Sequence, residues 1–390
     1  MLTSHNIETQ VSIENYDKNG NLKNIVKLPS ATAAVSGEIE CVIKNSDGTI
    51  ASVHAYPMRS LVKNFFAFLS SAIGGPTPTT QTTSGGVRND SYDTVHMLET
   101  GATYGQSLYG VMVGTGGATA VTPTQYALVT PVAHGTGAGQ LEYFPTQTSR
   151  VVAESTDYSM YAYRTFTNSS AGSITVSEVG LYVKTYNYVF YYMIARDTVD
   201  YAGNLINLVV GVGQTLTVLY KFKIYENSGL TNNFANALHY NFIEPQTCSF
   251  VDTLGSLRET SSILSNDMPF TTTAVLLSTY GLVVGSGSSA MNIDSHCLDS
   301  KISTGTSAGN LYYGNPYVNG AISTATYSVV RFGRSFTNFT VDDVIFNEFA
   351  WYGAGNVSNQ RCMMGRWLSG GITLSELESS QINISIIGYA

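Results

Sequence analysis

Apolar and polar residues alternate over short stretches through most of the chain, and this period of two predicts strands. In the clearest stretch, 215–224, every second residue is apolar: Leu216, Val218, Tyr220, Phe222 and Ile224. Similar patterns predict strands at residues 109–114, 139–143, 160–167, 174–183, 189–196, 205–210 and 382–386. Many short strands separated by turn residues are typical of a β-sandwich or jelly roll.

One stretch has helical spacing instead. Apolar residues recur every four positions at Leu61, Phe65, Leu69 and Ile73, and Gly74-Gly-Pro76 follows them. This spacing predicts a helix over about 59–73, because glycine and proline end helices. The Thr-, Ser- and Gly-rich segment 76–89 is predicted to be a loop.

Two hairpins are predicted near the N-terminus. Lys18-Asn-Gly-Asn21 lies between two alternating stretches, and Asn-Gly favours the positive φ angles of a tight turn. A second pair of stretches, 37–44 and 49–54, flanks Asn45-Ser-Asp-Gly48. We therefore expect this end of the chain to be β structure.

The chain repeats itself at an offset of about 170 residues. Gly110-Val-Met-Val-Gly-Thr-Gly116 returns as Gly281-Leu-Val-Val-Gly-Ser-Gly287, and Arg164-Thr-Phe-Thr-Asn168 returns as Arg334-Ser-Phe-Thr-Asn338. Fixed-period similarity indicates duplicated structural units. The helical residues also recur, which predicts a second helix over about 230–239: Leu61, Asn64, Phe65 and Leu69 match Leu230, Asn233, Phe234 and Leu238.

The repeat predicts the domain organisation. We expect a mainly β protein with two tandem repeated β-sandwich, jelly-roll-like domains, each with one short helix. The expected divisions are an N-terminal arm with a hairpin at 1–34, a first repeat at 35–225 and a second repeat at 226–390.

Composition supports a folded β protein with a polar, weakly charged surface. Of the 390 residues, 12% are charged, about half of the usual ~25%, and 43% are hydrophobic. The chain contains 37 Gly and 26 Tyr, which suits strands and turns more than long helices. Such a composition favours an extracellular or virion protein whose surface meets other subunits.

Charge and hydropathy exclude two classes of partner. The net charge is −8 and no run of Lys or Arg is present, so we expect no nucleic-acid binding. No stretch reaches the ~20 apolar residues of a membrane span. The N-terminal residues lack the pattern of a secretion signal, so we expect synthesis in a host cytoplasm and release by lysis.

Charged residues recur within apolar surroundings, and they are the sharpest chemical signal in the sequence. Each repeat supplies one glutamate and two arginines: Arg164, Glu178 and Arg196, matched by Arg334, Glu348 and Arg366. Isolated buried charges are costly, so we expect these residues to pair as a structural framework. The alternative is a glycosidase site at Glu178 or Glu348, but each copy supplies one carboxylate where two are needed.

Other chemical motifs are weak, so we predict no catalytic residue, cofactor or metal, and no enzymatic activity. The four cysteines form no C-x-x-C pair and are expected to be buried free thiols: Cys41, Cys248, Cys297 and Cys362. The histidines show no metal-ligand spacing, and the Gly-rich turns lack a phosphate-binding lysine. Asp17-Lys-Asn-Gly-Asn21 has only part of a calcium-loop pattern and is predicted to be a turn.

The first repeat resembles a β-domain of tailed-bacteriophage structural proteins. The resemblance spans roughly residues 10–225 and is carried by Val113-Gly-Thr-Gly116, Arg164-Thr-Phe-Thr-Asn168, Ser173-Ile-Thr-Val-Ser-Glu-Val-Gly-Leu-Tyr182 and Gly213-Gln-Thr-Leu-Thr-Val-Leu-Tyr220, among others. The second repeat departs from this pattern, with Phe349-Ala-Trp351 where the first has Val179-Gly-Leu181. The resemblance implies membership of a virion rather than one location within it.

The resemblance implies a non-enzymatic structural protein of a virion, present in many copies and contacting itself and other virion proteins. A tail or baseplate position is slightly favoured over capsid decoration. The alternative is a receptor- or glycan-binding adhesion protein, with a host-surface glycan as partner. That alternative predicts exposed aromatic residues on loops, including Trp351 and Trp367.

Overall fold

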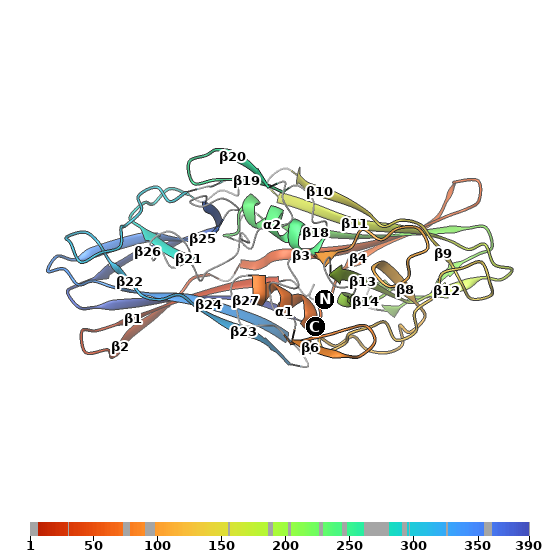
Figure 1. Ribbon diagram of the computed structural model, residues 1–390, viewed down its shortest axis with the longest axis horizontal. Helices are drawn as coiled ribbons and strands as arrows, with labels where there is room; N and C mark the ends of the chain where they lie inside the picture. Colours follow the sequence, from red (N-terminus) through yellow and green to blue (C-terminus); the bar gives the residue numbers. More distant parts are fainter. Residues whose placement is uncertain are drawn as a thin grey trace.

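The computed structural model describes most of the chain. The described residues are 7–29, 31–72, 79–89, 98–154, 157–185, 190–201, 204–225, 229–243, 248–260, 281–290, 295, 297–324, 327–354 and 361–389. They form several antiparallel sheets and two helices, so the prediction of a mainly β fold is confirmed. Figure 1 shows an elongated molecule with the helices and both chain ends near its middle.

One twelve-stranded sheet runs through both repeats. Its central order is β10 (Gln147–Glu154), β11 (Asp157–Thr167), β18 (Thr215–Ile224), β3 (Ala31–Lys44), β1 (Ile7–Tyr16), β27 (Ser379–Tyr389), β24 (Tyr327–Thr337) and β22 (Tyr312–Tyr313). Four strands lie off this path: β2 (Leu22–Lys27) pairs with β1, β4 (Ile50–Pro57) with β3, β9 (Glu142–Tyr143) with β11, and β23 (Tyr317–Ser323) with β24.

Each repeat also has a smaller sheet. The first contains β7 (Leu98–Glu99), β8 (Gly110–Gly114), β13 (Glu178–Thr185) and β14 (Tyr191–Thr198), and the second contains β21 (Gly281–Gly285), β25 (Val344–Ala354) and β26 (Arg361–Leu374). Short pairs complete the described strands: β5 (Thr79–Gln81) with β6 (Val87–Asn89), β12 (Ile174–Val176) with β17 (Leu208–Val210), β15 (Asp200–Tyr201) with β16 (Asn204–Leu205), and β19 (Cys248–Val251) with β20 (Leu257–Thr260).

The N-terminal hairpin completes the sheet of the second repeat. β1 pairs with the last strand, β27, along its whole length, from Ile7 opposite Gly388 to Tyr16 opposite Ser379. In the first repeat, β3 pairs in the same way with β18, and β4 lies beyond it. The hairpin β1–β2 therefore occupies in the second repeat the place that β3–β4 occupies in the first.

The predicted N-terminal arm with its hairpin, at 1–34, contributes β1 and β2 to the large sheet. The alternating residues Val11 and Ile13 point into the core and are 5% and 0% exposed. Burial of these side chains beside β27 favours pairing over a free arm. The sequence alone placed the hairpin correctly but gave no sign of its distant partner.

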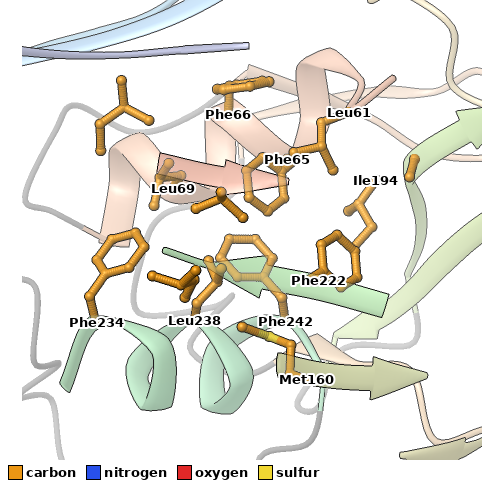
Figure 2. Close-up of a cluster of buried hydrophobic side chains, with 14 of the residues drawn as sticks. Leu61, Phe65, Phe66, Leu69, Met160, Ile194, Phe222, Phe234, Leu238 and Phe242 are labelled. Carbon is orange, nitrogen blue, oxygen red and sulfur yellow. The ribbon is translucent and has the colours of Figure 1, made fainter. Parts of the chain in front are cut away.

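The helices join the two repeats. α1 (Lys63–Ala72) contacts β14 of its own repeat and also β23 and β24 of the second. α2 (Asn232–Phe242) contacts β26 and also β10 and β11 of the first. Figure 2 shows the helices facing each other, and the ring centroids of Phe65 and Phe242 are 4.7 Å apart.

Both helices begin later than the sequence pattern predicts. Residues before α1 extend along β14: Leu61 forms a β-bridge with Ala195, and the Val62 N–H donates to the Ile194 carbonyl. Before α2, Leu230 forms the equivalent bridge with Gly365. The spacing of apolar residues does not distinguish these bridging residues from helical ones, because both are buried and apolar.

The segment predicted to be a loop at 76–89 contains the hairpin β5–β6, so that part of the prediction was wrong. Asn64 of α1 fixes it: the side-chain amide donates to the Gln81 carbonyl at 2.8 Å and accepts from the Gln81 N–H at 2.9 Å. Asn233 holds Val251 of β19 with the same two bonds, both 2.8 Å. The asparagine that binds the hairpin is therefore present at the matching position of both repeats, and this recurrence was the indication of the hairpin in the sequence.

We expect Ile13→Ala to lower the free energy of unfolding by about 2–4 kcal/mol, because Ile13 is fully buried where β1 meets β27. Ile25→Ala on β2, where the side chain is 48% exposed, should cost about 0.5 kcal/mol or less. Chemical denaturation measures both values. Equal, small effects would mean that the hairpin does not form part of the core.

Candidate functional site

The glutamate of the first repeat forms a buried ion pair with an arginine. Glu178 on β13 and Arg196 on β14 are both 0% exposed, and Oε2 accepts from Arg196 Nε and lies 2.8 Å from both Nε and Nη2. Oε1 accepts from the N–H groups of Gly116 at 3.0 Å and Thr130 at 2.8 Å. The Val129 N–H donates to Oε2 at 3.1 Å. Both carboxylate oxygens are therefore engaged, and this centre ties a glycine-rich turn to two strands.

The second repeat builds the same centre with one addition. Oε2 of Glu348 lies 2.8 Å from Arg366 Nε and 2.6 Å from Nη2, and Oε1 accepts from the N–H of Gly287 at 3.2 Å. Asp299 stands where the first repeat has Val129, and its Oδ2 lies 2.8 Å from Arg366 Nη2. Hydrogen bonds from Ser289 and the neighbouring arginine lower the pKa of Asp299. Arg366 thus has two carboxylate partners, whereas Arg196 has one.

Arg164 does not pair with glutamate, which corrects the expectation from the sequence. Its guanidinium donates to backbone carbonyls, at 2.6 Å to Phe144 and at 3.3 Å to both Tyr109 and Val111. It also lies over the ring of Tyr143, 4.7 Å from the centroid. Burial lowers the pKa of Arg164 to about 10.

Arg334 repeats this arrangement in the second copy. Nε donates to the Gly314 carbonyl at 2.8 Å and Nη1 to the Leu282 carbonyl at 3.1 Å, and the guanidinium lies over Tyr313. Burial lowers its pKa to about 10 as well. A guanidinium has five donors, so carbonyl groups at strand ends can satisfy it without a carboxylate. Sequence spacing could not distinguish this from an ion pair.

This geometry gives little support to glycosidase chemistry at Glu178 or Glu348. Both glutamates are 0% exposed, and their oxygens accept bonds from arginine and from backbone N–H groups. A glycosidase carboxylate must reach a substrate and work with a second carboxylate. Asp299 is near Glu348 but shares its arginine, so the arrangement is that of a structural clamp.

The first repeat contains a further buried carboxylate. Asp197 follows the paired arginine and is 1% exposed, and its Oδ1 accepts from the Arg59 N–H at 2.6 Å. Its Oδ2 makes no hydrogen bond to any part of the chain that the structure describes. Burial raises the pKa of Asp197 to about 7, against the opposing effect of the Arg59 N–H. Three fully buried side chains accompany it: Cys41, Tyr56 and Tyr220.

The matching positions of the second repeat are apolar. Strand pairing places Ile13 and Ile384 where the first repeat has Cys41 and Tyr220. The residue that matches Asp197 is Trp367. The sequence analysis did not predict this cluster. The one indication in the sequence was that Asp197 of the first repeat corresponds to Trp367 of the second.

The prediction of a buried free thiol is confirmed for Cys41, whereas the predicted burial is wrong for Cys297. Cys41 is free and buried, and burial raises its pKa to about 12. Cys297 is free but only partly buried. The side chains of Cys248 and Cys362 lie outside the described residues.

The structure describes no metal-binding group. Within the described ranges, His, Cys, Asp and Glu form no cluster of three or more. Asp17 instead accepts from the N–H groups of Asn19 and Asn21, both at 2.8 Å, and Gly20 has a φ of 80°. These contacts confirm a hairpin turn at this site.

The two tryptophans do not form an exposed aromatic loop. Trp351 lies on β25 and is 0% exposed. Trp367 lies on β26, is half-buried, and stacks on Phe349 with ring centroids 5.4 Å apart. The glycan-binding alternative therefore loses the two residues on which it was first based.

No family model, curated protein or solved structure matches this chain. Among the described residues, no helix is both long enough and apolar enough to cross a membrane.

We expect Glu178→Gln to lower the free energy of unfolding by roughly 3–5 kcal/mol, because it leaves the buried Arg196 without a carboxylate. Glu348→Gln should cost less, since Asp299 still pairs with Arg366. The double variant Glu348→Gln with Asp299→Asn should exceed the sum of its single effects. Denaturant titration of the parent, Glu178→Gln, Glu348→Gln, Asp299→Asn and the double variant measures the values. Equal losses in the free energy of unfolding for Glu178→Gln and Glu348→Gln would contradict the proposed difference between the two centres.

We expect Asp197→Asn to make stability less dependent on pH. The raised pKa means that the folded chain prefers protonated Asp197, so its contribution is fullest below the ordinary pKa and is lost as pH rises to about 7. The variant should be more stable than the parent near pH 8, by roughly 2–4 kcal/mol at most. Unfolding curves from pH 4 to 8 test this.

The control is Asp47→Asn in the exposed turn between β3 and β4, where hydrogen bonds from Thr49 lower the pKa. Above about pH 5, Asp47 is ionised in both the folded and the unfolded chain, so the slope there should not change. A parallel pH profile for Asp197→Asn and the parent would show that Asp197 is not a buried titrating group.

Proposed function

We propose that this protein is a non-enzymatic structural component of a tailed-phage virion, present in many copies. The observation that carries the proposal is that the two repeats have similar structures and that their recurring charged residues hold strands and turns together. Both Glu–Arg centres are buried and saturated. The resemblance of the first repeat to tailed-phage structural domains supplies the virion assignment.

The order of the large sheet supports a role in assembly. From the outer strands inward it runs β10-β11-β18-β3 in the first half and β23-β24-β27-β1 in the second. One chain therefore presents two similar ends, which suits contacts at pseudo-equivalent places around a symmetry axis. A tail or baseplate position is slightly favoured over capsid decoration.

Two equivalent sheet edges are suitable for contact with further copies. β2 and β4 each pair along one side with a described strand, and both carry exposed apolar residues. Leu22 and Ile25 on β2 are 51% and 48% exposed, and Ile50 and Val53 on β4 are 62% and 51% exposed. Edge strands of this kind pair readily with other chains.

The virion assignment predicts that the protein is found in particles purified by density gradient from lysates of the host that produces it. Peptide mass spectrometry measures its copy number relative to the other particle proteins, and antibody labelling in electron microscopy separates tail from capsid. Absence from purified particles, with the protein abundant in the lysate, would reject the proposal.

We also expect Ile50→Lys combined with Val53→Lys to reduce self-association, because two cations on one strand edge oppose pairing of equal edges. Light scattering after size exclusion measures the mass. His54→Lys on the same strand, which leaves the apolar pair intact, is the control. An unchanged mass for the double variant would remove β4 from the assembly contacts.

A further inference from the structure

The second half of the large sheet has a surface cleft of about 610 Å³ on its outward face. Its lining residues lie on β1, β27, β24 and β23 and at the end of β2. Figure 1 shows where these strands lie in the fold. A volume of this size lies within the range of small-ligand sites, roughly 300–1,000 Å³. The buried Arg334 side chain lies on the opposite, inward side of β24.

Gly333 makes room for Tyr317 at one side of the cleft. Gly333 on β24 lies opposite Tyr317 on β23, and a methyl group at this glycine would be 2.6 Å from both the Tyr317 hydroxyl and the Ile382 carbonyl oxygen. The tyrosine therefore lies across the space that a side chain would fill. In the first repeat this position is Tyr163, which is 39% exposed. The two halves thus differ at this position of the outward face.

The floor of the cleft is held by a chain of hydrogen bonds. Glu14 accepts from the Tyr16 hydroxyl at 2.5 Å and from Asn383 Nδ2 at 3.2 Å. Asn383 Oδ1 accepts from the Tyr317 hydroxyl and, at 3.2 Å, from Gln381 Nε2. These bonds fix the side chains before any ligand arrives, which reduces the entropy lost on binding.

Other polar groups of the cleft are available to a ligand. Within the described residues, no hydrogen bond or ion pair engages the side chains of Gln10, Ser12, Asn319 or Arg331. Amides and hydroxyls both donate and accept, as sugar hydroxyls require. Tyr317 is half-buried and adds an aromatic surface.

The charge of the cleft indicates an anionic ligand. Arg331 and Lys27 bring two positive charges, and Glu14, which accepts hydrogen bonds from Tyr16 and Asn383, brings one negative charge, so the lining is net positive. In the first repeat, Tyr161 and Ala55 hold the matching positions. Two cations can bind a ligand with one or two carboxylates, whereas binding of nucleic acid requires a longer row of positive charges.

We propose that this cleft binds a short oligosaccharide that carries a carboxylate. Arg331 pairs with the carboxylate, Tyr317 packs against a sugar ring, and the amides of Gln10 and Asn319 bind hydroxyls. The site is a property of the isolated chain and does not depend on the virion role.

The test is calorimetric titration of the full chain with three probes: trigalacturonic acid, a glucuronate-containing trisaccharide and sialyllactose. We expect at least one to bind, and its methyl ester to bind more weakly because the carboxylate charge is lost. Arg331→Ala should weaken that binding about tenfold, the usual effect of losing one charge-assisted hydrogen bond. Tyr317→Ala should also weaken it.

The matched controls lie on the first repeat. Tyr161→Ala corresponds in position to Arg331→Ala, and Gln147→Ala to Tyr317→Ala, so neither control should change the affinity. Thermal unfolding of each variant separates lost binding from lost folding. Failure of all three acids to bind, equal binding of the ester, or an equal effect of Tyr161→Ala would overturn the proposal. Presence or absence of the protein in particles bears only on the proposed function.

Discussion

The pairing of β1 with β27 is the interaction on which the rest of the structure depends. It brings the two ends of the chain together and completes the second half of the large sheet, which β1 then joins to the first half by pairing with β3. Without it, the buried face of β27 would lose the cover supplied by Val11 and Ile13. The helices depend on the same arrangement: Phe66 of α1 packs against Gly388 of β27, where a methyl group would lie 2.1 Å from its ring.

Buried charge is the second organising feature. The two Glu–Arg pairs and the two arginines bound to carbonyls recur at matching positions, so they predate the divergence of the copies. A buried pair is weak evidence for stability but a strong constraint on geometry, because a shifted strand would leave an uncompensated charge. These residues therefore determine how the turns pack against the strands in both repeats.

The copies differ where the framework permits it. The first repeat has a buried acidic and phenolic cluster around Asp197, whereas the second has apolar residues at the equivalent places. On the outward face, Tyr163 in one copy corresponds to Gly333 in the other, where the Tyr317 side chain takes up the space. The two copies thus differ both in the core and on the surface.

The sequence by itself determined the β class, the duplication, both helices and the positions of the buried charges, because alternation and recurrence are local properties of the chain. It could not determine which charges would pair: Arg164 and Arg196 have similar apolar neighbours, and only the tertiary structure brings carbonyls to one and Glu178 to the other. The partner of the N-terminal hairpin was also undetermined, since pairing between residues more than 360 positions apart leaves no local pattern. The cleft has the same origin, because it needs four strands from both ends of the chain to meet on one face.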